Sequence, residues 1–418
     1  MQATNIYDKL MWLFTTLLFV MFSVMKIPYG GIVLAVVLLL ILFLYAAQHN
    51  MKVCIRFTYM HTYMLIFAGY IALSSLWAIV PGYALRRVEP LLETMLAMVV
   101  LYSCYQDDGG IDKLLKALMW RGYFVLIYVV ARYGINTIMY MLRNDIRIDN
   151  DVLNANSIGL MASYSIIINF YYIFKRRHIK IADFFIIPAF LILVVSGSRK
   201  GLVLAVGGVV AVFVLRNWDN KQVVKSTLKV IGWGIVMTVF GIVILHLPFM
   251  EGILGRMDDL FLLLTGRGSR NLSGYVRLEY IKLGMDLFKE HPLIGIGIDN
   301  ARVYTIRISG LDHYLHNNYV EMLACGGIIG TALYYWIYAY LFHSFAKYKK
   351  LRDAEFDICL ILMICAVVME YGMVTYESRE TYYMLLLFCL EVDKLRKMYK
   401  TRNAAYGALD SYRCGAIE

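Results

Sequence analysis

One arginine stands apart from the other charged residues of the polar segment 250–315. If residues 275–290 form a helix, at about 100° per residue, the acidic residues and lysines share one arc, and Arg277 lies on the opposite, apolar face. A guanidinium on an apolar face is costly unless it meets an anion. Arg277 could snorkel or pair with a buried glutamate. The sharper hypothesis is that it binds an anionic ligand such as phosphate, whose oxygens suit its bidentate fork.

A second cationic group occurs in the short sequence Ser196-Gly-Ser-Arg-Lys-Gly201, which lies between two apolar runs. So short a connection places Arg199 and Lys200 at the start of the following helix. The free N–H groups and the dipole of a helix N-terminus favour negative charge there. These residues could be a simple interfacial anchor. The alternative is an anion site, with Ser198 in its turn as a supporting residue.

His316 and Asn317 stand at the start of a long apolar span. Gly327 and Gly330 lie near the same helical face and allow a neighbouring helix to pack closely, which would place His316 at the mouth of an interhelical cleft. A lone histidine is more often structural than catalytic, but its ordinary pKa suits a general base near neutrality. Glu321, just over one turn deeper, is an uncommon intramembrane carboxylate. We expect it to orient or pair with one of these cations.

The composition indicates what must position these residues. Of the 418 residues, 60% are hydrophobic and 17% are charged, and the mean hydropathy is +0.62. Soluble domains are about 45–50% apolar and about 25% charged, so a pair of soluble domains is excluded. The net charge of +11 is spread in small groups between apolar runs, which is typical of membrane-orienting loops rather than of nucleic-acid binding. The seven cysteines show no CxxC spacing, so we expect neither a disulfide framework nor a zinc site.

A helix needs about 20 apolar residues to cross the hydrocarbon core of a bilayer. The sequence therefore predicts an all-α, polytopic membrane protein with about twelve transmembrane helices. They are expected near residues 10–26, 28–46, 62–80, 88–105, 117–135, 155–174, 181–197, 200–216, 229–249, 316–342, 357–374 and 381–393.

The distribution of Lys and Arg predicts the orientation, because cytoplasmic loops carry an excess of both. Most of them fall on the side of the N-terminus, so both termini are expected in the cytoplasm and the long polar segment outside. We divide the chain into N-terminal membrane helices (1–249), a large extracytoplasmic loop with amphipathic helices (250–315), C-terminal membrane helices (316–393) and a basic cytoplasmic tail (394–418).

Three further patterns carry less information. Asp149-Asn-Asp151 has the DxD form of metal-binding nucleotide-sugar transferases, but it is expected outside, where nucleotide sugars are scarce. Gly295-Ile-Gly297 lacks a βαβ context and is interpreted as a turn. Arg86 and Arg87, expected on the outer side, could contact lipid headgroups or an anionic substrate.

Taken together, these segments resemble the O-antigen ligase and O-antigen polymerase superfamily of bacterial membrane glycosyltransferases. The similarity covers most of residues 70–335. Ala155 stands where the family pattern has proline. The matching positions are His316-Asn317, Gly327 and Gly330 of the ligase-type signature; Ser196-Gly-Ser198-Arg199; Arg277 through Pro292-Leu-Ile-Gly295-Ile-Gly297; Asn156 in Asn154-Ala155-Asn156; Ser74-Ser-Leu-Trp77; and the Arg86 region.

The resemblance implies a GT-C-like, multi-span helical fold with a large outer loop between two late spans. It implies a donor oligosaccharide on undecaprenyl pyrophosphate and transfer to a glycan acceptor, without nucleotide, metal or other cofactor. Arg199, Arg277 and Lys200 would bind the pyrophosphate, and His316 would take the proton of the acceptor hydroxyl with inversion of the anomeric centre. Flippase and chain-length regulator proteins are expected partners, and nucleic acid is not.

The residues leave the exact reaction open. The first hypothesis is a polymerase of lipid-linked repeat units, for O-antigen, capsule or exopolysaccharide, at the outer face of the bacterial cytoplasmic membrane. The second is a ligase that transfers the finished glycan to a lipid, cell-wall or protein acceptor. A transporter or flippase of lipid-linked glycans would also need cations in a membrane cleft, but at several depths, whereas Arg199, Arg277 and His316 are all expected near one face.

Overall fold

A computed structural model gives the fold over residues 6–24, 30–144, 155–176, 178–217, 225 and 272–414. These residues form helices, with no strand among them, in agreement with the predicted all-α class. In chain order the elements are α1 (Ile6–Val24), α2 (Gly30–Gln48), α3 (Tyr59–Ser74), α4 (Pro81–Tyr105), α5 (Gly110–Tyr133), α6 (Ile135–Arg143), α7 (Ala155–Arg176), the 3-10 helix η1 (Ile181–Phe185), α8 (Ile186–Val195), α9 (Arg199–Asn217), α12 (Leu272–Glu290), α13 (Ala301–Ser309), α14 (Asn318–Lys347), η3 (Lys349–Leu351), α15 (Ala354–Met369) and α16 (Arg379–Cys414).

Six of the described helices are long and apolar enough to cross a membrane: α2, α4, α5, α7, α9 and α14. Helices suit a bilayer because each satisfies its own backbone hydrogen bonds. The predicted span 229–249 lies outside the described residues, and every other predicted span overlaps a helix. The total of twelve spans stays a prediction.

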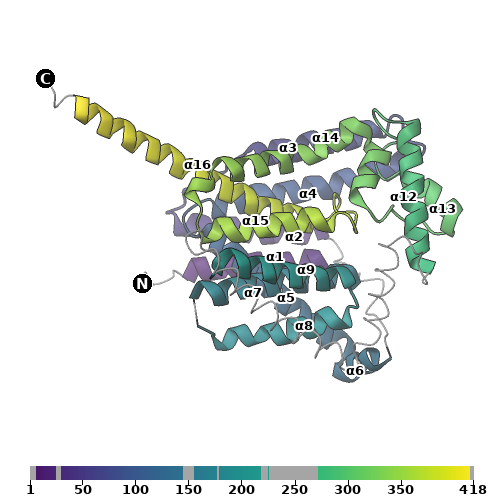
Figure 1. The fold of residues 1–418 in the computed structure, drawn as a ribbon, viewed down its shortest axis with the longest axis horizontal. Helices are drawn as coiled ribbons and strands as arrows, with labels where there is room; N and C mark the ends of the chain where they lie inside the picture. Colours follow the sequence, from purple (N-terminus) through teal and green to yellow (C-terminus); the bar gives the residue numbers. More distant parts are fainter. Residues whose placement is uncertain are drawn as a thin grey trace.

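Several predicted spans differ in extent from the helices observed there, and two of these differences have a clear cause. The span expected at 62–80 ends at Ser74, because residues 75–77 form a turn. The last span, expected to be short at 381–393, belongs to the 36-residue α16, which continues beyond the bundle (Figure 1). Charged residues after 393 ended the apolar run in the sequence, but Lys, Arg, Leu and Met are good helix formers, so the helix does not end there.

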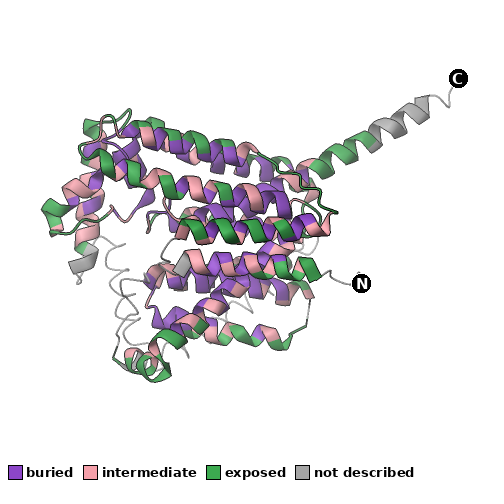
Figure 2. Ribbon diagram, turned by 180° about the vertical axis from the view of Figure 1, so that it is seen from behind, coloured by how far each residue is buried: buried purple, intermediate pink, exposed green. Residues whose placement is uncertain are grey.

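The helices pack around α7, which contacts α5, α8, α9 and α15. Ser163 Oγ lies 2.6 Å from the carbonyl oxygens of both Gly159 and Gly201, so α7 and α9 touch near their N-terminal ends. A Cβ at Gly201 would lie 2.9 Å from the Gly159 carbonyl carbon. Figure 2 shows buried residues where helices face one another and exposed residues on the outer faces. Exposed apolar side chains such as Ile32 and Leu39, both 65% accessible, suit contact with lipid.

The last part of the predicted outer loop forms α12 and α13. Figure 1 shows α12 running across one end of the bundle, while the start of α1 and the far end of α16 lie at the other end. Gly284 of α12 faces Val320 and Leu315, so α12 packs closely on the beginning of α14. The glycine-rich sequence 266–274 lies largely outside the described residues.

A break in α14 fixes the position of the segment that follows α12. Gly327 has φ 61° and ψ −165°, a conformation that favours glycine. The backbone groups freed there pair with the turn 292–297: Ile328 N donates to Pro292 O (2.8 Å) and Gly297 N donates to Cys325 O (3.0 Å). The partner at Gly327 is therefore a turn, and the expected packing of a neighbouring helix at this glycine is wrong.

Candidate active site

His316 lies just before α14 in a strained conformation. Its φ of 58° is left-handed, which is uncommon for a residue with a side chain, so His316 does not share a helical stripe with Gly327 as the sequence predicted. Asn317 is the N-cap of α14, and its Oδ1 accepts a hydrogen bond from Val320 N at 3.1 Å. Backbone strain of this kind persists where the surroundings hold it in place.

Glu321 holds the backbone on the other side of His316. Its buried carboxylate accepts a hydrogen bond from Leu315 N through Oε2 at 2.7 Å, and the Cys325 thiol lies 3.6 Å from Oε1. No ion pair joins Glu321 to a cation among the described residues, so the expected pairing is not observed. The carboxylate is used to satisfy a buried N–H group instead, and Glu321 contributes to the positioning of His316.

Aromatic rings surround the His316 imidazole. Tyr280 of α12 stacks nearly parallel to it, with ring centroids 6.0 Å apart, and Tyr314 meets it edge-on at 4.7 Å. The His313 ring lies 5.8 Å away. These contacts fix the orientation of the imidazole plane. The groups that influence its protonation state lie further away.

Cations dominate the electrostatics at His316. Burial, together with the positive charges of Arg277, Lys200, His313 and Arg302, lowers the pKa of His316 to about 3. The imidazole is therefore neutral at neutral pH. The same charges show that Arg277 and Lys200, two predicted anion ligands, lie close enough to act on His316.

Arg277 lies on α12 with its side chain half-buried. Burial lowers the pKa of Arg277, and the nearby Tyr314 opposes this effect only in part. Within the described residues, no acceptor forms a hydrogen bond or ion pair with its guanidinium. An intramolecular counter-ion, which was the alternative to a ligand, is thus not found in this part of the chain.

The turn that was predicted to bind an anion lies at the start of α9, and four residues come together there. Arg199 is the first residue of α9, and Lys200 follows it with its ammonium hydrogen-bonded to Gly372 O. Ser198 Oγ donates to Asn156 Oδ1 at the start of α7 (3.4 Å). Both Arg199 and Lys200 are half-buried. Their binding of an anion stays a prediction.

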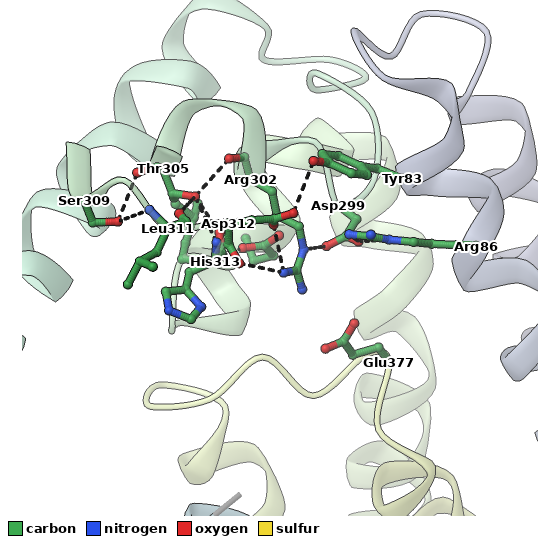
Figure 3. Close-up of polar contacts among 12 residues, drawn as sticks. Tyr83, Arg86, Asp299, Arg302, Thr305, Ser309, Leu311, Asp312, His313 and Glu377 are labelled. Atoms are coloured by element: carbon green, nitrogen blue, oxygen red, sulfur yellow. Dashed lines mark hydrogen bonds and ion pairs between the residues drawn. The ribbon is translucent and has the colours of Figure 1, made fainter. Parts of the chain in front are cut away.

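A second arginine cluster lies nearby and was not predicted from the sequence. Asp299, which is 1% exposed, accepts from Arg86 Nη2 at 3.0 Å, Arg87 Nε at 2.8 Å and Arg302 Nε at 2.5 Å (Figure 3). Arg87 also pairs with Glu377 at 2.5 Å. We call Asp299, Arg86, Arg87, Arg302 and Glu377 the Asp299 network. It joins α4, the turn before α13 and the segment between α15 and α16.

Arg86 is thus part of α4 and of an ion pair, rather than of a loop with a free guanidinium. It also stacks on Tyr83, with 4.3 Å to the ring centroid. Arg302 bonds Asp312 as well as Asp299. Burial lowers the pKa of Arg302, but Asp299, Glu377 and Tyr376 together raise it by more, so the net pKa lies above its usual value. Sequence spacing could show that Arg302 follows Asp299 by one helical turn, but not that α4 supplies two more arginines.

A comparison with known protein families indicates which kind of protein has this site. Residues 184–335 match the family model described as O-antigen ligase. Over this range the chain is similar to that family, and we refer to residues 184–335 as the O-antigen ligase domain. This confirms the resemblance to the O-antigen ligase and polymerase superfamily and indicates a glycosyltransferase-like enzyme of a membrane. No curated protein matches the chain.

The O-antigen ligase domain contains several of the predicted site residues, and other parts of the chain complete the surroundings. The Asp149-Asn-Asp151 sequence lies before the domain and outside the described residues. Within the matched range are Ser198, Arg199, Lys200, Arg277, His316, Asn317 and Glu321, whereas Arg86, Asn156 and Glu377 lie outside it.

A cavity of about 450 Å³ borders this domain. Its lining comes largely from residues 369–384, between and within α15 and α16, with further side chains from α4 and α7. Tyr314 lines the cavity and also contacts the His316 ring, so its side chain belongs both to the cavity wall and to the surroundings of His316. Lys200 reaches Gly372, which adjoins the lining residue Met373. The cavity is therefore next to the predicted anion ligands.

Proposed function

We propose that the protein transfers an oligosaccharide from undecaprenyl pyrophosphate to a sugar hydroxyl at the outer face of the bacterial cytoplasmic membrane. The observation that carries the proposal is the half-buried Arg277, which has no acceptor among the described residues and lies beside a neutral His316. A desolvated guanidinium gains from an anionic ligand. A pyrophosphate provides at least two negative charges for it.

In the proposed reaction, the acceptor oxygen forms a bond to the anomeric carbon of the donor sugar. The bond from that carbon to the pyrophosphate oxygen breaks, and the electron pair leaves with the pyrophosphate. Arg277, Arg199 and Lys200 stabilise the charge that grows on the leaving group, which lowers the barrier more than it strengthens ground-state binding. These side chains serve in place of a metal, and a single displacement inverts the anomeric centre.

His316 takes the acceptor proton in this proposal. Without the donor, burial and the surrounding cations hold the pKa of His316 at about 3, so the imidazole is an available but weak base. A bound pyrophosphate opposes those positive charges and raises the pKa toward its ordinary value. The base then becomes effective when the leaving group is in place, which suits a reaction that must spare the donor from water.

Topology gives the proposal further support. The start of α1 and the far end of α16 lie opposite α12 (Figure 1). Lys347 ends α14, and Lys349 and Lys350 follow it, at the end of the helix remote from His316. With basic residues in the cytoplasm, as is usual, His316 lies on the outer side and both termini lie inside.

The first form of the proposal is a polymerase that joins lipid-linked repeat units. A ligase is the second form, and it is favoured by the description of the matched family, O-antigen ligase. Both forms use the same donor chemistry and differ in the acceptor. Flippase and chain-length regulator proteins are proposed partners of the polymerase form.

The test uses purified protein in lipid vesicles, with a synthetic undecaprenyl-pyrophosphate-linked oligosaccharide. Products of increasing length identify a polymerase, and a single transfer to an added lipid, cell-wall or protein acceptor identifies a ligase. His316→Ala is expected to lower kcat by about 100-fold or more. Wild-type turnover in this variant would overturn the base assignment, and the absence of any transfer by the native protein would overturn the proposed function.

A further inference from the structure

The cavity of about 450 Å³ lies beside the proposed donor site but is lined by residues of different chemistry. Its volume falls in the range of roughly 300–1,000 Å³ that is usual for small-ligand pockets. Tyr314 separates it from the His316 ring, and the segment that contains Gly372 separates it from Lys200. A molecule in the cavity would therefore lie close to a donor bound at the proposed donor site, next to Tyr314 and Gly372.

Charge distinguishes the cavity from the surroundings of His316. Two arginines and three glutamates line it: Arg87, Arg379, Glu370, Glu377 and Glu380. Carboxylates thus outnumber guanidinium groups, whereas cations dominate around His316. A second pyrophosphate would be disfavoured in the cavity, and a neutral ligand rich in hydroxyl groups would be accepted.

The remaining lining combines aromatic and hydroxyl side chains. Carboxylates and hydroxyls accept hydrogen bonds from sugar hydroxyls, and aromatic rings pack against the apolar faces of a sugar ring. Methionines and other apolar side chains line part of the wall as well. The aromatic and hydroxyl residues include Phe22, Tyr164, Tyr314, Ser157, Ser378 and Thr381.

Of the three glutamates, Glu377 has the greatest free capacity to accept hydrogen bonds. Glu380 is bound by the buried Arg121. Glu377 pairs through Oε2 with Arg87 Nη1 at 2.5 Å, and no donor within the described residues forms a hydrogen bond with its Oε1. Its side chain is 23% exposed, and Figure 3 shows the carboxylate below Asp299 and Arg302. Glu370 already accepts from four side chains: Asn318, Tyr334, Tyr335 and Thr375.

We propose that this cavity binds the terminal sugar of the acceptor and that Glu377 accepts hydrogen bonds from its hydroxyl groups. The inference rests on the proposed function, because it names the subsite for the second substrate. Burial raises the pKa of Glu377, while Arg87 opposes the shift. A group that is poorly solvated in this way gains from donors that a sugar supplies.

The first experiment separates acceptor binding from donor binding. With the donor saturating and its lipid-free repeat oligosaccharide as acceptor, Glu377→Gln is expected to raise the acceptor KM about 10-fold or more, because a hydrogen bond to a charged group is lost. The donor Kd and the slow hydrolysis of donor without acceptor should stay as in the native protein. Glu377→Asp should recover part of the loss. A merely structural role would alter donor hydrolysis as well.

Filling the cavity gives an independent test. Ala366 lines the cavity on α15, and Val368, which is 61% exposed, lies two residues further on the same helix. Ala366→Phe should raise the acceptor KM, and the matched control Val368→Phe should not. If Ala366→Phe weakens donor binding instead, the cavity takes the isoprenoid chain of the donor and the inference is wrong.

The outcomes distinguish this inference from the proposed function. An acceptor KM unchanged in both Glu377→Gln and Ala366→Phe, with normal transfer by the native protein, would overturn the acceptor subsite alone. Transfer that is absent in the native protein would overturn the function. Direct binding of the lipid-free oligosaccharide to the native protein and to Glu377→Gln, measured by calorimetry without donor, tests the subsite even in that case.

Discussion

Two arginine-rich regions lie at the same end of this bundle, and they differ in how their charges are met. In the Asp299 network, each guanidinium reaches a carboxylate: Arg86, Arg87 and Arg302 all contact Asp299. Around His316, Arg277 finds no acceptor among the described residues. The comparison indicates that the first set of arginines holds helices together, whereas we propose that Arg277 binds an anionic ligand.

The physical reason is the cost of removing a charge from water. A buried ion pair regains part of that cost from its partner, and loss of one partner leaves the other charge uncompensated. An arginine with no partner keeps the cost until an anion binds, so binding energy is stored at the site. Substitutions in the two regions should therefore affect different quantities.

The largest expected effect is at Arg277. Arg277→Ala should lower kcat/KM for glycan transfer by about 100-fold or more, because one donor to the leaving group is lost. The melting temperature should not fall, since removal of a half-buried charge that has no partner among the described residues relieves a desolvation cost. Steady-state kinetics and thermal unfolding measure both. Lys289→Ala, an exposed position on the same helix, is the control. Normal kinetics in Arg277→Ala would remove the distinction between the two regions.

The main effect of Asp299→Ala should be a loss of stability. It leaves three guanidinium groups around an empty position, and the free energy of unfolding should fall by about 3 kcal/mol. Chemical denaturation in detergent micelles measures it, with the exposed Asp286→Asn as control. A variant that unfolds like the native protein, yet no longer transfers glycan, would assign the Asp299 network to substrate binding instead.

The pH dependence of stability should reveal the lowered pKa of His316, to which the surrounding cations contribute. The unfolded chain binds a proton at this histidine below about pH 6.5, whereas the folded chain binds it only near pH 3. The unfolded state therefore holds more protons in this window, and stability should decrease as the pH falls from 6.5 to 3. His316→Gln should make the decrease shallower, as measured by melting temperature against pH. Equal slopes would mean that burial and the surrounding positive charges do not lower the pKa of His316.

The smallest effect is expected at Arg86. Its side chain is 42% exposed, and Arg87 and Arg302 remain to neutralise Asp299. Arg86→Gln should change the free energy of unfolding by less than about 1 kcal/mol and leave transfer close to normal. Denaturation and kinetic assays on this variant, beside Asp299→Ala, sharpen the comparison. A loss of transfer as large as that of Arg277→Ala would place Arg86 at the substrate.

Local patterns were sufficient to select candidate residues for this site. The apolar face around Arg277, the short turn before Arg199 and the position of His316 at the start of a span all follow from a few consecutive residues. Tyr280 of α12 stacks on the His316 ring, so the segments that carry Arg277 and His316 meet in the fold. Runs of about 20 apolar residues predicted the membrane helices for the same reason.

Contacts between distant segments could not be predicted in this way. The role of Glu321 depends on the N–H group of Leu315, in a backbone that turns before the helix begins. Glu377 and Asp299 belong to segments far apart in the sequence, and Arg87 links them only after α4 has packed. The left-handed conformation of His316 depends on both neighbours being held, so no pattern of residue types revealed it.

The pairing of the 292–297 turn with the opened backbone at Gly327 limits how this region can vary. Two backbone segments, the turn 292–297 and the residues around Gly327, are joined by hydrogen bonds at both ends of the turn. Gly297 N donates to Cys325 O, and Ile328 N donates to Pro292 O. Inserting or deleting a single residue inside the turn would shift every donor past its acceptor, and α12 would slide relative to the imidazole. Length changes should therefore be tolerated before α12 but not between α12 and α13.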